Sequence, residues 1–308
     1  MIVVLTGGSG GAKLIEGLAA EIDLMELTIV CNTGDDAIFH GLYVSPDIDT
    51  ITYTLAGLND SAKGWGIKDD SFVVLDQLRR LGNEVWFKLG DKDFATHITR
   101  TRLLKEGQKL SQITDQMRRS LGIRSTILPM SDERIETRIG TARGEISFQE
   151  FFVKHRWAPE VSAVGFAGAE KSQPVPGVLD AIRHADAIIV GPSNPITSIG
   201  PILAVPGIRS TLSESKVPIV AVNPLIGAAA IAGPAHKLMT ACGFEASALG
   251  VARIYADFLD TLVIADEDQT QRGAIESLGV KVMTTNIRMA ELAAKRRLAR
   301  ELLALAQK

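Results

Sequence analysis

The sequence is poor in cysteine and lacks the motifs of cysteine and histidine chemistry. Its two cysteines, Cys31 and Cys242, form neither a metal-ligand spacing nor a disulfide framework, although a bond between them stays open. Such low cysteine use favours a reducing compartment, and we expect a cytoplasmic protein. The H-E-x-x-H and C-x-x-C motifs and a Ser-His-Asp order are missing too, so zinc chemistry and triad hydrolysis have no support.

An excess of charge and a membrane-crossing segment are also missing. The formal net charge of -3 argues against a broad nucleic-acid surface. Residues 1–5 lack the basic start and the long apolar stretch of a secretion signal. The uncharged stretch 217–235 is interrupted by Pro218, Pro224 and Pro234, which predicts a strand, a loop and a buried helix rather than a span. We therefore expect neither nucleic acid nor membrane as a partner.

What the sequence does contain is an alternation of short apolar runs and helical periodicity. The runs predicted as strands are 2–5, 27–31, 85–88, 187–190, 219–222 and 262–265. Helical periodicity lies between them, as over 12–20, 178–184 and 269–278. Several runs are apolar throughout, as expected where helices cover both faces of a parallel sheet. We predict a Rossmann-like, doubly wound α/β fold with a mostly parallel sheet.

One polar segment interrupts this alternation. Residues 93–124 are polar and helical, and they predict a small helical insertion. The remaining residues, 1–92 and 125–308, then form the Rossmann-like nucleotide-binding domain.

Two further elements are expected in the second half of the chain. Residues 134–139 and 145–153 alternate in polarity as the arms of a β-hairpin do. An amphipathic helix is expected from about Ile287, with Thr285 or Asn286 as its N-cap.

A glycine-rich loop follows the first predicted strand and opens a helix. Its glycines let the backbone approach a ligand closely, and the free N–H groups with the helix dipole favour an anion. The spacing matches neither a P-loop nor the dinucleotide pattern G-x-G-x-x-G. A tight turn without a ligand is the alternative, but the strand-to-helix context favours phosphate binding. The phosphate-binding candidates are Gly8, Ser9, Gly10, Gly11 and Lys13.

Two acidic loops follow the glycine loop. Asn32, Asp35 and Asp36 end the second predicted strand, and Asp47 and Asp49 follow a Ser-Pro turn. Because the carboxyl ends of strands share one edge of a sheet, we expect these side chains to face the same crevice. Carboxylates beside a phosphate loop suit phosphoryl transfer assisted by Mg²⁺. Helix capping is the alternative for each aspartate taken singly.

Two more loops point to the same edge. Lys88 ends the predicted strand 85–88, and a helix after it carries His97, which is a minor candidate. Ser193 and Asn194 lie in a turn between two prolines, where hydroxyl, amide and backbone groups can bind a ligand. An ordinary Ser-Asn turn is the alternative.

Taken together, these motifs resemble the 2-phospho-L-lactate transferase family of coenzyme F420 biosynthesis. The matching stretches run from the first strand to the second half of the chain: GGSGGAKL (7–14), NTGDD (32–36), GLYVSPDIDT (41–50), LGDKD (89–93), ILPMSD (127–132) and GPSNP (191–195). Each stretch is modest alone, but the ordered set is specific.

The resemblance implies a Mg²⁺-dependent enzyme of the phospho-group transferase class. A guanosine diphosphate-linked donor would give its phospho-organic acid to the deazaflavin Fo, yielding an F420 precursor and GMP. The acid is phospholactate, phosphoenolpyruvate or 3-phosphoglycerate, and the sequence does not choose among them. Family members commonly form homodimers.

The resemblance also assigns roles to individual residues. Asp49 and Lys88 would contact Fo, and Asp49 and Asp47 are the catalytic candidates. Asp49 would either hold Mg²⁺ with Asp36 or draw the hydroxyl proton, and both roles stay open. The guanosine phosphates would be held by the glycine loop with Asn32, Asp35, Ser193 and Asn194.

A second class of protein shares part of this pattern. The related gluconeogenesis-factor family of nucleotide-sugar-binding regulators has a similar glycine loop and a loop like 32–36, and would bind without turnover. The stretches SPDID (45–49) and LGDKD (89–93) favour the transferase. A nicotinamide dehydrogenase is disfavoured by the glycine spacing.

Overall fold

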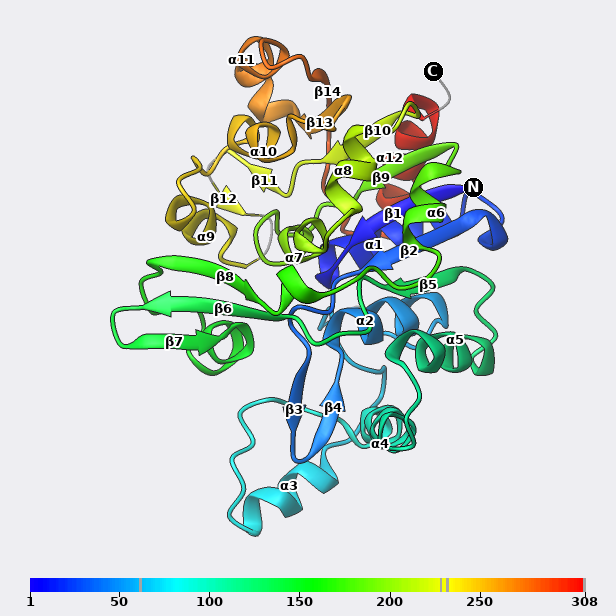
Figure 1. Ribbon diagram of the computed structural model, residues 1–308, viewed down its shortest axis with the longest axis vertical. Helices are drawn as coiled ribbons and strands as arrows, with labels where there is room; N and C mark the ends of the chain where they lie inside the picture. Colours follow the sequence, from blue (N-terminus) through cyan, green and yellow to red (C-terminus); the bar gives the residue numbers. More distant parts are fainter. Residues whose placement is uncertain (61–62, 228, 231–232, 307–308) are drawn as a thin grey trace.

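A seven-stranded parallel sheet forms the centre of the molecule (Figure 1). The computed structural model describes residues 1–60, 63–227, 229–230 and 233–306. In their order across the sheet, the strands are β14 (Lys281–Thr285), β13 (Thr261–Ala265), β10 (Ile219–Val222), β9 (Ala187–Val190), β1 (Ile2–Thr6), β2 (Leu27–Cys31) and β5 (Thr126–Pro129). The predicted doubly wound α/β fold is confirmed.

Helices cover both faces of this sheet, which explains its continuously apolar strands. On β1, Val3 and Leu5 pack into one core cluster and Val4 packs into the other, all with no exposed surface. The helices of the first cluster are α6 (Val178–Arg183), α7 (Ile199–Ala204), α8 (Ile208–Ser213), α9 (Ala235–Ala241), α10 (Ala248–Tyr255) and α11 (Arg272–Glu276). Those of the second are α1 (Gly8–Ala19), α2 (Pro46–Leu55), α5 (Leu110–Ser120) and α12 (Leu292–Leu305).

The direction of winding reverses between β1 and β9. From β1 the chain first adds β2 and β5 on one side, and then returns to add β9, β10, β13 and β14 on the other. The loops that leave β1 and β9 therefore diverge at this point, which is where open α/β sheets bind ligands. The two loops nevertheless touch, because a Cβ atom on Gly10 would lie 2.4 Å from the carbonyl oxygen of Pro192.

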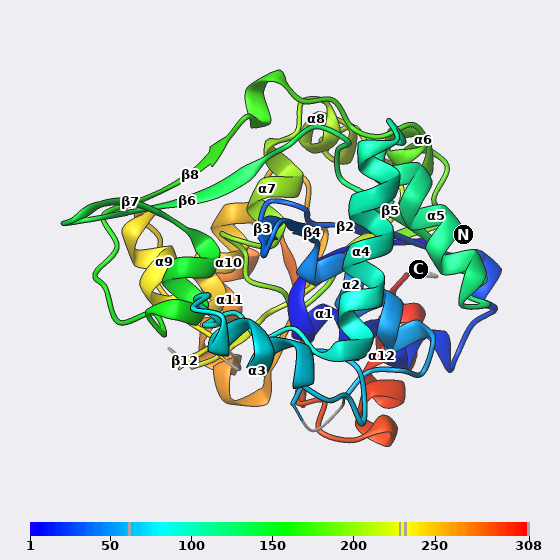
Figure 2. The ribbon, with the colours of Figure 1, turned by 90° about the horizontal axis from the view of Figure 1, so that it is seen from below.

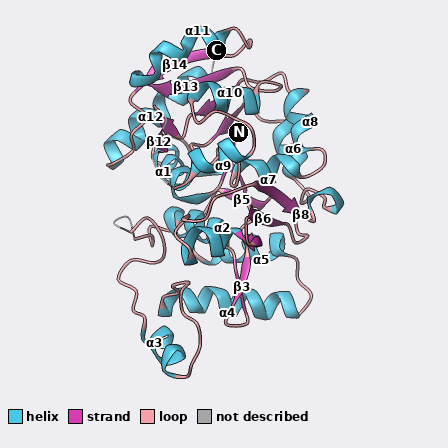
Figure 3. Ribbon diagram, turned by 90° about the vertical axis from the view of Figure 1, so that its left-hand side faces the viewer, coloured by secondary structure: helices cyan, strands magenta, loops and turns pink. Residues whose placement is uncertain are grey.

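The lower part of the molecule in Figures 1 and 3 extends from the carboxyl edge of the sheet. It contains the hairpin β3 (Ala37–Phe39) and β4 (Leu42–Val44), with α3 (Val73–Arg80) and α4 (Asp91–Lys105). Figure 2 shows α4 passing beside the hairpin, and the Tyr43 N–H donates to Thr101 of α4 at 2.8 Å. The helices expected over 93–124 are present as α4 and α5, while the division into two domains stays a prediction.

The predicted β-hairpin is present, but it ends earlier and gains a strand. β6 (Glu136–Thr141) and β7 (Gly144–Ser147) pair in antiparallel fashion, and β8 (Ala163–Ala167) pairs with the other edge of β6. The second arm stops because Ser147 and Glu150 cap one another: each backbone N–H donates to the other's side chain, at 3.0 and 3.2 Å. A π-helical turn then occupies Glu150–Lys154.

One predicted element and one predicted helix start are wrong. Residues 85–88 form no strand, because Phe87 stacks on Phe39 at 4.0 Å between ring centroids, outside the central sheet. The last helix begins at Leu292 with Glu291 as its N-cap, not near Ile287. Asn286 instead closes a turn, accepting the Arg288 N–H at 3.0 Å, and Thr285 ends β14.

The uncharged stretch 217–235 begins with the expected strand, but the expected helix starts only at Ala235, the last residue of the stretch. It contains β10, the short strands β11 (Leu225–Ile226) and β12 (Ala229–Ala230), and the start of α9, while residues 228, 231 and 232 lie outside the described part. Within the described residues, no helix combines the length and the apolar character needed to cross a bilayer.

Candidate functional site

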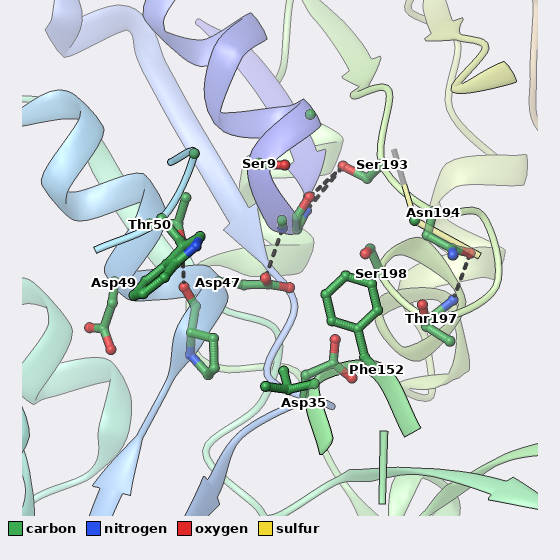
Figure 4. Close-up of a pocket in the computed structure, with 18 of the residues that line it drawn as sticks. Ser9, Asp35, Asp47, Asp49, Thr50, Phe152, Ser193, Asn194, Thr197 and Ser198 are labelled. Atoms are coloured by element: carbon green, nitrogen blue, oxygen red, sulfur yellow. Dashed lines mark hydrogen bonds between the residues drawn. The ribbon is translucent and has the colours of Figure 1, made fainter. Parts of the chain in front are cut away.

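A cavity of about 880 Å³ lies at the carboxyl edge of the sheet, where the winding reverses. Most of the residues singled out from the sequence line it together, and Figure 4 shows several of them. Those in the lining are Gly8, Ser9, Gly10, Lys13, Asp35, Asp47, Asp49, Lys88, Ser193 and Asn194. Gly11, Asn32 and Asp36 are not in the lining and lie behind it.

One side of the cavity is made by the loops after β1 and β9, and we call it the glycine wall (residues 7–13 and 192–194). Gly8 has a φ of 66°, a left-handed conformation that favours glycine. A Cβ atom on Gly11 would lie 1.6 Å from the Thr6 hydroxyl oxygen, so glycine fits at this position without a shift of the buried Thr6 side chain. Steric necessity thus explains part of this motif before any ligand is considered.

The predicted polar side chains of the second loop hold the glycine wall together. The Ser193 hydroxyl donates to the Gly7 carbonyl at 2.7 Å and accepts the Gly7 N–H at 3.2 Å. The side-chain oxygen of Asn194, Oδ1, accepts the N–H groups of Ile196 and Thr197 at 3.0 and 3.3 Å. Ser193 therefore positions the phosphate-loop candidate, whereas the amide nitrogen of Asn194 makes no hydrogen bond with the described residues and Asn194 lines the cavity.

Two buried carboxylates meet at the N-terminus of α1. Asp47 accepts the Gly8 N–H at 2.8 Å and the Asn32 side-chain amide at 2.9 Å. The same amide nitrogen lies 3.1 Å from Asp35, whose second oxygen, Oδ1, has no hydrogen-bond partner among the described residues. Figure 4 shows Asp47 beside the first turn of α1 and Asp35 at the cavity floor.

Burial makes the negative charges of Asp35 and Asp47 unfavourable. Burial raises the pKa of Asp47 to about 6, and the hydrogen bonds from Asn32 and Gly8 only partly oppose it. Burial, followed by the charge of Asp47, also raises the pKa of Asp35 well above its ordinary value. A pair of this kind is relieved either by a proton or by a cation.

Asp36 has a different environment from its neighbour Asp35. It accepts a short hydrogen bond from the Ser45 hydroxyl, and burial raises its pKa. Asp36 is buried and does not line the cavity. Its hydrogen bond with Ser45 connects the loop after β2 to the turn before α2.

Asp49 sits in a buried ion-pair network. Both of its oxygens face the guanidinium of Arg100, one in a short contact and one at 3.1 Å, and Arg100 is only 1% exposed. Burial by itself lowers the pKa of Arg100, but the Asp49 carboxylate outweighs burial and the net pKa is raised. His97 lies between two carboxylates, 3.7 Å from Asp49 and 3.2 Å from Asp93. This network fixes the orientation of Asp49.

The opposite side of the cavity is formed by two segments rich in aromatic residues, and we call it the aromatic wall (residues 86–88 and 148–156). The segments are side by side, because the Lys154 amine lies 5.5 Å from the Trp86 ring centroid and 3.1 Å from Glu84. Phe148 stacks on Phe152 at 5.3 Å, and Figure 4 shows Phe152 projecting into the cavity.

Positive charges without partners line both walls. In the described part of the chain, neither Lys13 nor Lys88 makes an ion pair or a hydrogen bond through its side chain, and both are exposed. Unpaired cations in a cavity favour a negatively charged ligand.

The sequence prediction did not include several residues in and around the cavity. His97, a minor candidate, lines the cavity, whereas Arg100 is buried outside the lining, and only the fold shows that both face Asp49. The i, i+4 spacing of Phe148 and Phe152 could have signalled a common face, but nothing local marks Trp65 as a lining residue.

A doubly wound α/β sheet with its cavity at the point of reversal defines a class of ligand-binding proteins, and sequence comparison places the chain more narrowly. The sequence model of the family described as "2-phospho-L-lactate transferase CofD" matches residues 2–296. The chain therefore belongs to this transferase family, as the motifs predicted.

Three relatives are similar over nearly their whole length. The 2-phospho-L-lactate transferase of Methanothermobacter thermautotrophicus is 44% identical over 98% of this chain and 97% of its own. That of Methanosarcina mazei is 43% identical over 90% of this chain and 91% of its own. The phosphoenolpyruvate transferase of Streptomyces griseus is 43% identical over 99% of this chain and 98% of its own.

A solved structure supports the fold. A UPF0052 family protein from Bacillus halodurans has a TM-score of 0.66 and 17% sequence identity, covering 98% of each chain. At that identity the likeness concerns the fold alone.

Proposed function

We propose that this protein transfers a phospho-organic acid from a guanosine diphosphate-linked donor to the deazaflavin Fo. The ribityl hydroxyl oxygen of Fo would form a bond to the phosphorus that carries the acid. The bond from that phosphorus to GMP breaks along the opposite line, and the hydroxyl proton is lost. The products are an F420 precursor and GMP.

The observation that carries this proposal is that one cavity joins the two kinds of binding group. The glycine wall offers backbone N–H groups, a helix N-terminus and Lys13 to a diphosphate. Asp49 and Lys88 line the same cavity with an aromatic wall that suits a flat ring. Catalysis would then depend on positioning and on charge neutralisation.

A divalent cation fits the buried carboxylate pair. We infer that Asp35 and Asp47 hold Mg²⁺, because Asp35 Oδ1 lacks a partner among the described residues and both acids have raised pKa values. Mg²⁺ is commonly bound by one or two carboxylates together with substrate phosphates and water, and it neutralises phosphate charge. Among the described residues, no three His, Cys, Asp or Glu side chains gather to hold a metal by themselves.

Asp49 and Asp36 were the metal candidates of the sequence, and their contacts support other roles. Asp49 lines the cavity and Arg100 fixes its orientation, so we propose that Asp49 orients the Fo hydroxyl by accepting its hydrogen bond and receives the proton as the new bond forms. Asp36 is engaged by Ser45 behind the lining, and we propose that it holds the acidic loops together.

A donor panel tests the proposal. Purified protein with Mg²⁺ and Fo is mixed with guanosine diphosphate linked to lactate, enolpyruvate or glycerate, and the products are measured by mass spectrometry. We expect the phospho-acid adduct of Fo, together with GMP, from at least one donor. No adduct with any donor would overturn the proposal. A cytoplasmic location and a homodimer belong to the same proposal, and sedimentation of the purified protein tests the dimer.

A further inference from the structure

Arg156 is an unpaired cation on the aromatic wall that the roles above leave unused. It lines the cavity, and in the described part of the chain its guanidinium makes neither an ion pair nor a hydrogen bond. The acids nearby have other partners: Glu84 pairs with Lys154, Glu150 accepts from Ser147, and Glu160 pairs with Lys237. Arg156 is therefore free to bind an anion.

The backbone holds Arg156 in place at a cost. Arg156 and Trp157 both have a φ of 47°, in the left-handed region that side chains with a Cβ avoid. Such strain persists only where the surroundings impose it, and it is concentrated at functional sites.

The contacts that impose this conformation surround the turn. The Trp157 N–H donates to the Phe151 carbonyl at 2.8 Å, and the Trp157 ring packs on Phe152 at 5.3 Å. The Lys237 amine donates to the carbonyls of Trp157, Ala158 and Pro159 at 3.1–3.3 Å. These contacts fix the backbone of the turn from which the Arg156 side chain reaches the cavity lining.

We propose that Arg156 binds the carboxylate of the acid that is transferred, an inference that rests on the proposed function. The glycine wall and Lys13 already supply donors for phosphates, whereas Arg156 lies on the opposite wall. Its planar fork matches a carboxylate in a bidentate way. Lactate, enolpyruvate and glycerate all carry such a carboxylate, so Arg156 selects acids as a class rather than one of the three.

Two esters of guanosine diphosphate isolate this contact. One carries the acid chosen by the donor panel, or lactate if none is chosen, and the other carries ethanol, which lacks the carboxylate. Calorimetric titration compares wild type, Arg156→Gln and Arg143→Gln. Arg143 is a matched control, because it is an exposed arginine in the β6–β7 turn outside the cavity lining.

The expected result is weaker binding of the acid ester alone, and only when Arg156 is changed. Arg156→Gln weakens binding of the acid ester roughly 10- to 100-fold and of the ethyl ester less than about twofold. Arg156→Lys, which keeps the charge but not the fork, falls between. Arg143→Gln changes neither ester.

Four outcomes overturn the inference. Unchanged binding of the acid ester to Arg156→Gln removes Arg156 from the site. Equal weakening of the binding of both esters means that Arg156 contacts the nucleotide. A raised KM for Fo alone means that Arg156 contacts the acceptor. A wild-type protein that binds neither ester overturns the proposed function as well, so the two failures are distinct.

Discussion

The two walls of the cavity are built on opposite principles. In the glycine wall the polar groups largely satisfy one another, as Ser193 bonds to Gly7 and Asp47 bonds to Gly8. In the aromatic wall, Lys88 and Arg156 have no partners among the described residues, and flat rings dominate. The loops of the glycine wall are thus held by hydrogen bonds among their own groups, with Lys13 as the unpaired charge, whereas the aromatic wall keeps both Lys88 and Arg156 available for a ligand. This difference predicts that substitutions in the first wall damage the fold and that those in the second damage affinity.

The largest effect is expected from Gly11→Ala in the glycine wall. Its Cβ atom would lie 1.6 Å from the Thr6 hydroxyl oxygen, so the buried Thr6 side chain must rotate or β1 and α1 must move apart. We expect a loss of about 3 kcal/mol in the free energy of unfolding, measured by urea denaturation. Gly273→Ala in α11 is the control, because nothing lies within 4 Å of its Cβ atom and stability should hold or rise. Equal losses for both variants would contradict the steric account.

Asp49→Ala is expected to abolish most of the turnover. Loss of a group that positions and deprotonates the hydroxyl lowers kcat at least about 100-fold. Because Arg100 then stays buried without its partner, Asp49→Ala with Arg100→Met separates loss of folding from loss of chemistry. Asp180→Ala, an exposed acid on α6, serves as control. Unchanged turnover would remove Asp49 from the site.

Magnesium should stabilise the glycine wall in a pH-dependent way. The pKa of Asp47 is raised from 3.8 to about 6, so the folded state binds this proton more tightly than the unfolded state does. The contribution of Asp47 to stability therefore falls as pH rises from about 4 to 6. Mg²⁺ can offset the repulsion between Asp35 and Asp47 only when these carboxylates are ionised. We expect saturating Mg²⁺ to raise Tm by about 2–5 °C at pH 7.5 and by less at pH 5.

Thermal melts with Na⁺ at equal ionic strength control for screening in that comparison. The same Tm shift at both pH values would mean that the cation binds elsewhere.

The smallest effect is expected from Lys88→Gln in the aromatic wall. The side chain is exposed and has no partner among the described residues, so the fold should not change. If Lys88 contacts Fo, the KM for Fo should rise about tenfold while the Tm of the variant stays unchanged. Lys105→Gln, an exposed lysine at the end of α4, is the control. A lowered Tm for Lys88→Gln would show that the aromatic wall, too, is held together by its charges.

The same contrast explains what could be predicted from the sequence. The glycine wall lies in loops that directly follow predicted strands, so topology alone brings Gly8, Asp35 and Ser193 to one edge. The aromatic wall has no such local rule. The apolar run at 85–88 has the composition of a strand, and only contact with Phe39, from a hairpin far away in the chain, decides otherwise. Long-range packing of this kind leaves no trace in local periodicity.

The position of β1 has a consequence for how the protein is made. β1 is completed only by β9, and the hydrogen bond from Gly7 to Ser193 spans 186 positions. At the usual pace of translation, about 10–40 s separate the synthesis of these two residues. Lys295 of α12, which pairs with Glu16 of α1 at 2.6 Å, emerges later still. During synthesis β2 can pair with one edge of β1, but the other edge of β1 and the contacts between the glycine loop and Ser193 must wait until β9 has been made.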